Sequence, residues 1–332
     1  MDLTSLTLLA TVGAGYGVPV DGFPSRSERV LLLWTNAARV APEEFDQEYR
    51  SGYEPCSFDD FLADEQVPKS PMYIDVALTE ASRYHSATME ENNCFQHESC
   101  DGSGEDFGTR VSHYYTESGY IGENIAMGTD SARYAVMGMW MCSSGHRSNI
   151  MLGDYNEMGP GISGVYLTQD FAAGSLTEGE PPVRMGVDDG GVWYADWEED
   201  EGPAGISLVV EGVEVPMALT YGAPELGIYS VTPDVDADDC RDWYIWWKTA
   251  AGDEGTFPEE GSFQYGGACE ADWVELQARR GGLFGDVPPE ELPGAMLEDL
   301  TLVGCNAAPG AGAAGLLGIA GAALLAVRRR RR

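Results

Sequence analysis

Gly122-Glu123-Asn124-Ile125 is the stretch around which the rest of this chain is organised. Two isoleucines, Ile121 and Ile125, bracket the carboxylate of Glu123, so we expect it to be partly buried. A buried carboxylate must be ion-paired, hydrogen-bonded or metal-bound to offset the cost of losing water. Gly122 permits a backbone conformation in which a side chain would clash, and we interpret residues 119–126 as a turn that leads into a short apolar segment.

Two histidines flank this stretch. His97 lies in a short loop that a local disulfide could close, and such a loop can hold an imidazole in a defined geometry. His146 follows a Ser-Ser-Gly turn. Two imidazoles and one carboxylate, with water as the fourth ligand, form a suitable set for zinc or another divalent cation. From these residues alone, however, His97 is equally explained as an exposed loop histidine.

The other two histidines are interpreted as structural. His85 falls on the apolar face of a helix expected over residues 75–91, which favours packing over ligation. The sequence identifies no partner for His113. A serine nucleophile beside His146 is disfavoured, because residues so close together on one turn do not give the geometry of a catalytic triad.

Helical periodicity also predicts a helix over residues 27–40. Ser25 and Glu28 match a capping box at its start, and the apolar residues that follow recur along one face. Ser131 is a plausible N-cap of a later helix, whose apolar stripe indicates core packing. Residues 161–172 have the pattern of a strand.

In this order and at this spacing, the residues resemble the CAP superfamily, which comprises the cysteine-rich secretory, antigen 5 and pathogenesis-related 1 proteins and is also known by its SCP domain. The similarity is to the bacterial branch and covers nearly half of the chain. The matching segments are Asn36-Ala-Ala-Arg39, Pro71-Met72, Leu78 with Ala81, His97, Gly122 to Ile125, Trp140 to Ile150, Gly161-Ile162 and Gln169-Asp170-Phe171.

The resemblance implies an α-β-α sandwich with an open cleft, in which the family carries two histidines and two acidic residues. Some members bind a divalent metal there. His97, Glu123 and His146 occupy the matching positions. The family's second glutamate usually follows the tryptophan of the later helix, but no glutamate follows Trp140 here, so that carboxylate is missing.

A second region, residues 185–285, has a different composition. Short β-rich runs alternate with Gly, Pro and Asp turns, which indicates an all-β sandwich of immunoglobulin-like type. By analogy, such an appendage solubilises the protein or contacts carbohydrate. The acidic stretches 198–201 and 234–239 are candidate calcium loops, although the second lacks the glycine and the distal glutamate of an EF-hand.

The two ends of the chain carry targeting features. The first residues resemble the apolar core of a secretion signal but lack its basic start, so the segment is either a truncated signal or part of the mature chain. The end resembles a MYXO-CTERM sorting tail, with Cys305 as the processing or anchoring point; the alternative is a plain membrane anchor. The expected division is 1–22 signal segment, 23–178 CAP domain, 185–285 β-sandwich, 286–304 acidic Pro-rich linker and 305–332 sorting or transmembrane tail. The fold class is therefore α+β.

Charge and cysteine content indicate the compartment. The chain has 19 basic and 55 acidic residues, and five of the basic ones are the terminal arginines, so binding to nucleic acid is excluded. The seven cysteines include no Cys-x-x-Cys pair, which disfavours a zinc ribbon. An oxidising, extracytoplasmic location is indicated. The expected disulfides are Cys94–Cys100, Cys240–Cys269 and Cys56–Cys142, which leaves Cys305 unpaired.

Three functions are compatible with this pattern. The leading one is a secreted or surface-displayed binding module whose His/Glu cleft is suited to a divalent metal such as Zn²⁺. Its partner would be an extracellular lipid, glycan or protein, and the tail would provide contact with the membrane or cell surface. The second is a metal-dependent, peptidase-like hydrolase that uses Glu123 on a metal-bound water. The third is sequestration of a lipid or another small apolar ligand.

Overall fold

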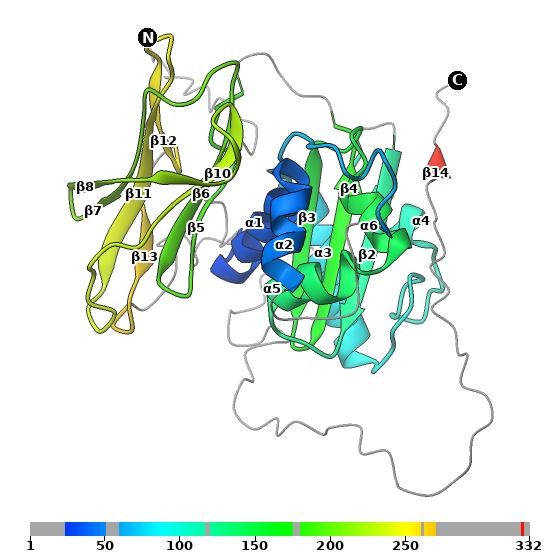
Figure 1. Cartoon of the computed structure of the whole chain (residues 1–332). Coiled ribbons are helices and arrows are strands. Elements are labelled where there is room, and N and C mark those ends of the chain that lie inside the picture. Colours follow the sequence, from blue (N-terminus) through cyan, green and yellow to red (C-terminus); the bar gives the residue numbers. More distant parts are fainter. Residues whose placement is uncertain are drawn as a thin grey trace, which may run out of the picture.

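A computed structural model describes residues 24–50, 60–116, 120–174, 180–259, 262–269 and 327–328, and every structural statement below concerns these residues. The expected signal segment, the linker and almost all of the tail, including Cys305, lie outside them. Figure 1 shows a helix-and-sheet layer structure beside a β-sandwich. Among the described residues, no helix is both long enough and apolar enough to cross a membrane.

The first unit is a layered α-β-α structure. Its sheet has the order β1-β3-β4-β2-β14; β1 runs parallel to β3, and the other pairs are antiparallel. Helix α3 covers one face, and α1, α5 and α6 lie toward the other (Figure 1). The elements are α1 (Arg26–Val40), α2 (Pro42–Arg50), β1 (Tyr73–Ile74), α3 (Val76–Glu91), α4 (Phe107–Ser112), β2 (Tyr120–Met127), α5 (Ala132–Tyr134), the π-helix η2 (Ala135–Trp140), α6 (Ser144–Ile150), β3 (Glu157–Ser163), β4 (Tyr166–Ala172) and β14 (Val327–Arg328).

The second unit is a sandwich of two antiparallel sheets, as expected from its alternating runs and turns. One sheet has the order β5-β6-β10-β9, and the other has the order β12-β11-β7-β8, with β13 also paired to β11. The strands are β5 (Gly186–Asp189), β6 (Val192–Glu198), β7 (Gly205–Val210), β8 (Val213–Pro216), β9 (Ala218–Ala223), β10 (Leu226–Val231), β11 (Arg241–Lys248), β12 (Glu254–Phe257) and β13 (Phe263–Tyr265).

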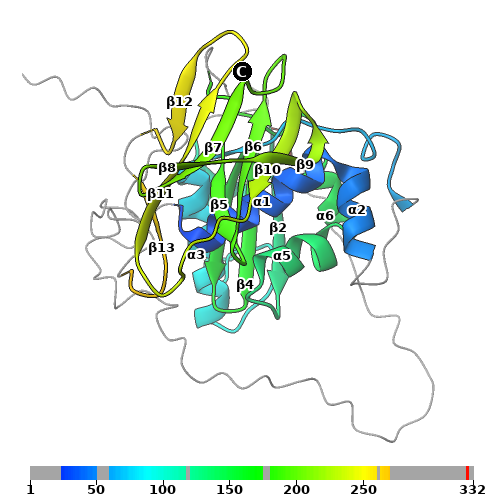
Figure 2. The ribbon, with the colours of Figure 1, turned by 60° about the vertical axis from the view of Figure 1, so that its left-hand side comes forward.

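Helix α1 begins at the predicted capping box. The Ser25 side chain accepts from the Glu28 backbone N–H, and the Glu28 carboxylate accepts from the Ser25 N–H at 2.7 Å. The sequence suggested one buried face, but every residue from Glu28 to Val40 is buried. A helix of this kind must be covered on all sides. Figure 2 shows why: strands of the sandwich cross in front of α1, whose other side faces the first sheet.

One face of the sandwich joins the hydrophobic core of the first unit. The cluster that contains Leu33 and Trp34 of α1 also contains Val187, Tyr194 and Ile228 of the sandwich. The Trp34 and Tyr194 rings meet edge to face, with centroids 5.8 Å apart. The sandwich therefore packs against the first unit through one face, while a separate core that includes Trp193 and Trp243 lies within the sandwich itself.

Buried polar contacts cross the same boundary. Asn36 Nδ2 donates to Asp196 Oδ2 at 3.1 Å and to the Met72 carbonyl at 3.0 Å. The other oxygen of Asp196 accepts from the backbone N–H groups of Arg184 and Met185. Complete burial raises the pKa of Asp196 to about 6 despite these donors. Asn36, found in the sequence as a family position, thus connects α1 to the residue before β1 and to the sandwich.

Helix α3 lies directly on strand β3 because glycine permits it. A Cβ atom at Gly159 would lie 2.0 Å from the Leu78 backbone carbon, so no residue with a side chain fits at this position. Ser82 of α3 donates to the Gly159 carbonyl at 2.6 Å and also contacts Asp170 of β4. This close contact places the polar side chains of α3 against the sheet.

The structure corrects two sequence interpretations. Residues 119–126 were expected to form a turn, but they belong mainly to strand β2, in which residues 122–126 are all buried. Residues 161–172 were expected to form one strand, but they span a hairpin of β3 and β4. In both places the strands are buried on both faces, so the alternation that reveals a half-exposed strand is absent.

Two of the expected disulfides are confirmed. Cys94–Cys100 closes the loop that carries His97, and Cys240–Cys269 joins two loops of the sandwich region. Cys142 is also disulfide-bonded. Its expected partner, Cys56, lies outside the described residues, so that pairing stays a prediction.

We expect the shared core to make the two units unfold together. Ile228→Ala, at a fully buried position, should lower the free energy of unfolding by about 3 kcal/mol, because it leaves a cavity beside α1. The matched control is Leu219→Ala on the neighbouring strand, which is 39% exposed and should cost less than about 1 kcal/mol. Urea denaturation followed by tryptophan fluorescence and far-UV circular dichroism measures both effects. Two separate transitions in the wild type would contradict a shared core.

Candidate functional site

Glu123 lies in the middle of β2, opposite Asp170 of β4 in the strand register. Because directly opposed residues share a face of the sheet, both carboxyl groups point to the side covered by α3. Contact between Asp170 and Ser82 confirms that direction. The Glu123 side chain is only 1% exposed, so this carboxylate belongs to the protein interior.

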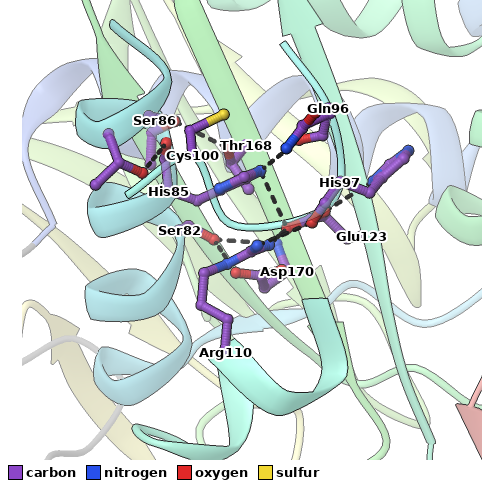
Figure 3. Close-up of polar contacts among 12 residues, drawn as sticks. Ser82, His85, Ser86, Gln96, His97, Cys100, Arg110, Glu123, Thr168 and Asp170 are labelled. Atoms are coloured by element: carbon purple, nitrogen blue, oxygen red, sulfur yellow. Dashed lines mark hydrogen bonds and ion pairs between the residues drawn. The ribbon is translucent and has the colours of Figure 1, made fainter. Parts of the chain in front are cut away.

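Both oxygens of Glu123 have partners (Figure 3). His97 Nδ1 lies 2.7 Å from Oε1, and Arg110 of α4 pairs with Oε2. A third group, His85 Nε2, lies 4.0 Å from Oε2. Arg110 is itself only 1% exposed, so Arg110 and Glu123 form a buried ion pair. Removing either partner would leave an uncompensated buried charge.

The pKa values of the two opposed carboxyl groups, Glu123 and Asp170, are shifted in opposite directions. Burial opposes ionisation of Glu123, but the charge of Arg110 and the hydrogen bond from His97 outweigh it, so the pKa of Glu123 is lowered. Burial and the neighbouring Glu123 raise the pKa of Asp170 well above its usual value. Ser82 has one hydroxyl proton but two close acceptors, the Gly159 carbonyl and Asp170 Oδ2. Ser82 donates to Asp170 Oδ2 at 2.8 Å, and the Asp170 backbone N–H donates to the Ser82 hydroxyl at 3.1 Å.

His97 is held from two directions. A carboxylate only accepts hydrogen bonds, so Nδ1 carries the proton in its contact with Glu123 and Nε2 is the nitrogen left for other partners. The backbone carbonyl of His97 accepts from Arg110 Nη1 at 2.9 Å. The side chain is 28% exposed, and Figure 3 shows the ring extending away from the carboxylate. One arginine therefore positions both the carboxylate and the loop of the histidine.

Side chains from the later helices cover the outer edge of β2. Asn149 of α6 donates to the Glu123 carbonyl at 3.1 Å, and Trp140 Nε1 donates to the Ile125 carbonyl at 2.9 Å. Carbonyls two residues apart point in the same direction along a strand. These side chains thus occupy an edge position that another strand would otherwise fill.

Asn124 and Gly122 bring α6 close to this edge. Asn124 Nδ2 donates to the His146 carbonyl at 3.1 Å, and Asn149 donates to Asn124 Oδ1 at 2.9 Å. A Cβ at Gly122 would lie 2.4 Å from the hydroxyl of Tyr155. The glycine, which we expected to form a turn, instead makes room in the strand for the segment that carries His146.

Burial keeps two of the histidines neutral. Desolvation, and then the charge of His97, lowers the pKa of His146 to about 4. Its Nδ1 is buried and has no hydrogen-bond partner in the described part of the chain. Desolvation also lowers the pKa of His85 to about 4. As expected, His85 is a packed helix residue, and its Nε2 lies 3.0 Å from the Gln96 carbonyl. His113, by contrast, contacts Glu105 at the surface.

The residues present do not fit a metal held by Glu123. Its two oxygens are engaged by Arg110 and His97, and the guanidinium is a permanent positive charge where a cation would bind. Within the described ranges, no group of three or more His, Cys, Asp or Glu residues is placed to hold a metal ion. His97 contacts the Glu123 carboxylate directly. Among the described residues, the His146 side chain makes no contact with Glu123. The three predicted residues are therefore not assembled as a common ligand set.

Sequence reasoning missed Arg110 and Asp170. A signal for Arg110 was available, since a carboxylate between two isoleucines requires a partner and few basic residues precede the terminal arginines. Nothing in the local sequence selects Arg110 among them. Asp170 was quoted as a motif residue without a role. Its place beside Glu123 depends on strand pairing.

Comparison with known proteins finds one family model over this unit. Residues 35–172 match the model described as CAP, the cysteine-rich secretory protein family. The uncharacterized membrane protein YlbC of Bacillus subtilis is 37% identical over 98 residues, which is 29% of this chain and 27% of that protein. The uncharacterized protein YkwD of the same organism is 36% identical over 104 residues, 30% of this chain and 39% of that protein. The chain thus spans only about a quarter to two-fifths of these relatives.

Solved structures also match. An extracellular protein containing an SCP domain from Bacillus anthracis is 28% identical, with a TM-score of 0.29, over 31% of this chain and 34% of that chain. An outer surface protein from Borrelia burgdorferi is 15% identical, with a TM-score of 0.30, over 48% of this chain and 99% of that chain.

Removing the guanidinium of Arg110, which pairs with Glu123, should destabilise the fold. Arg110→Met should lower the free energy of unfolding by about 3–5 kcal/mol, because it leaves the buried carboxylate unpaired. Adding Glu123→Gln in the same chain should recover part of the loss. Urea denaturation of the wild type, both single variants and the double variant gives the coupling energy. Additive effects would show that the pair is not coupled.

His85 should make the fold sensitive to acid. Its pKa is lowered from 6.5 to about 4 in the folded state, so the unfolded chain binds its proton first as the pH falls. Its contribution to stability is complete above about pH 6.5 and should decrease by about 3 kcal/mol toward pH 4. His85→Gln keeps a hydrogen-bond donor without titrating. Urea denaturation across this pH range measures the free energy of unfolding of the wild type and of the variant, and their difference gives the contribution of His85. Asp196 affects both proteins equally, and its raised pKa stabilises the fold as the pH falls.

Proposed function

Because the chain carries a domain of the CAP family at residues 35–172, we propose that the protein is an extracytoplasmic binding module in which His97 and His146 contact the ligand. The observation that carries this proposal is the full engagement of Glu123 by Arg110 and His97. A carboxylate paired in this way orients an imidazole and is not free to remove a proton from water. The site is thus arranged to hold His97 rather than to supply a general base.

The chemistry of the two histidines indicates the kind of ligand. His97 offers Nε2, since Nδ1 is engaged with Glu123. His146 is half-buried, and it is neutral near pH 7 because burial lowers its pKa to about 4. A neutral imidazole offers one acceptor nitrogen. Ligands rich in O–H or N–H groups, such as a glycan or a peptide, suit these positions better than an anion does.

A divalent ion such as Zn²⁺ is a weaker proposal. Glu123 does not fit as a ligand, but a carboxylate behind an imidazole is a common outer partner of metal-bound histidine. His97 and His146 are the residues that would hold the ion, which would supply Lewis acidity. The peptidase-like hydrolase needs a free Glu123 and is disfavoured by the same contacts. No contact of the described residues favours sequestration of a lipid.

Disulfides support the extracytoplasmic location. Cys94–Cys100 and Cys240–Cys269 are formed, and such bonds persist in oxidising compartments. Display on the cell surface through residues 305–332, with Cys305 as the processing or anchoring point, remains part of the proposal. Mass spectrometry of the mature C-terminus tests it, because an intact Arg332 would exclude processing.

Binding and catalysis are separated by testing one set of proteins for both. Saturation-transfer NMR with chitohexaose, a mixed peptide and palmitate should show contact for the glycan or the peptide, and His97→Ala should lose that contact. The matched control is His113→Ala, a surface histidine outside the site. A fluorogenic peptide and ester panel, run with and without Zn²⁺, should show no turnover. Turnover by wild type that disappears in His97→Ala would contradict the binding function.

A further inference from the structure

The β-sandwich carries a groove of about 450 Å³ that the CAP site does not use. It lies where β7 and β8 of one sheet approach β10 of the other, and in Figure 2 the chain runs from β8 to β9 across this end. Its lining is mainly apolar and rigid. Three prolines, Pro203, Pro216 and Pro224, line it together with Met217 and Tyr229. The Tyr229 hydroxyl donates to the Pro224 carbonyl, so the ring is held in place.

Strand β8 forms an open edge beside this groove. It is the terminal strand of its sheet among the described residues. Met217 N–H donates to the Ile206 carbonyl at 3.0 Å. In an antiparallel ladder the backbone groups of successive residues face alternately toward and away from the partner strand. The backbone groups of Val215 therefore face β7, and those of Glu214 and Pro216 face outward. Pro216 has no N–H, which suits an outward position. The Glu214 N–H and carbonyl and the Pro216 carbonyl therefore remain for an added strand.

The rim of the groove is acidic. Exposed carboxylates stand next to its lining residues in the sequence: Glu201 precedes Gly202, Glu225 follows Pro224, and Glu214 lies on β8. The two acidic loops are joined, because Glu199 N–H donates to the Glu225 carbonyl. A cation on the same sheet, Lys248 of β11, is already paired with Glu254. The electrostatic complement of this rim is a basic partner.

We propose that this groove and edge bind an extended basic peptide segment of a partner protein, which pairs with β8 and inserts one apolar side chain between the prolines. Strand addition supplies backbone hydrogen bonds, and a pocket beside the edge selects side chains. Side chains two residues apart share a face of a strand, so lysine or arginine two residues before and after the apolar residue would face the acidic rim. This second site is independent of the function proposed for His97 and His146.

A designed peptide tests the proposal on the full chain. The probe is a fluorescein-labelled extended peptide with a central leucine and a lysine two residues before and after it, and its binding is measured by fluorescence anisotropy. Replacing its lysines with glutamate should weaken binding at least about tenfold, because charge complementarity is lost. N-methylation of its backbone, or replacement of its central leucine with alanine, should each weaken binding severalfold, since these remove strand pairing and groove contact respectively.

Protein variants distinguish this groove from the acidic surface in general. Glu201→Lys with Glu225→Lys should weaken binding about tenfold. The control reverses two exposed acidic residues of the CAP unit, Glu91→Lys with Asp130→Lys, and should change affinity less than about twofold. Near-UV circular dichroism confirms that each variant is folded. Equal loss in both double variants, or equal binding of the N-methylated peptide, would overturn the proposal.

Discussion

The buried ion pair of Arg110 and Glu123 is the interaction on which the site depends. Moving two charges out of water is costly, and the cost is offset only when both partners are correctly placed and further hydrogen bonds satisfy them. Arg110 meets this requirement by bonding Glu123 and also the carbonyl of His97. Helix α4, strand β2 and the Cys94–Cys100 loop must therefore all be in register before the pair can form.

The covered edge of β2 is the second constraint. Asn149 donates a hydrogen bond to the outward carbonyl of Glu123, and Trp140 donates one to that of Ile125. Asn124 donates to the carbonyl of His146. These hydrogen bonds replace those of a neighbouring strand and fix α6 to the sheet. Residues that look like a string of family motifs in the sequence are thus one hydrogen-bonded unit, which determines where His146 lies relative to His97.

The sandwich completes the fold of the first unit by covering α1. Arg39 of this helix, fully buried, donates to the backbone carbonyls of Ser70, Ile150, Leu152 and Tyr155. The same helix contacts the sandwich through Trp34 and Asn36. One buried helix therefore connects the sandwich to the end of α6, the helix that carries His146. Packing around α1 links the two units, whose compositions suggest separate domains.

Short-range features were readable from the sequence because their causes are local. The Ser25–Glu28 capping box, the helix over 75–91 and the Cys94–Cys100 bond each involve residues within one or a few turns. The need for a partner at Glu123 was also predictable, since desolvation of a carboxylate is general. These local rules do not specify which residue meets that need.

The tertiary structure decided the rest. Strand β2 was not recognised because both of its faces are buried, which removes the alternation of polar and apolar residues. Asp170 reaches Glu123 only through strand register, and Arg110 reaches it only by the placement of α4. The sequence by itself determined that Glu123 needs a buried partner and that His97 lies in a loop closed by a local disulfide. Only the three-dimensional packing, which sets the direction of each side chain relative to the sheet, turned Glu123 inward to Arg110 and made it the support of His97 rather than a ligand.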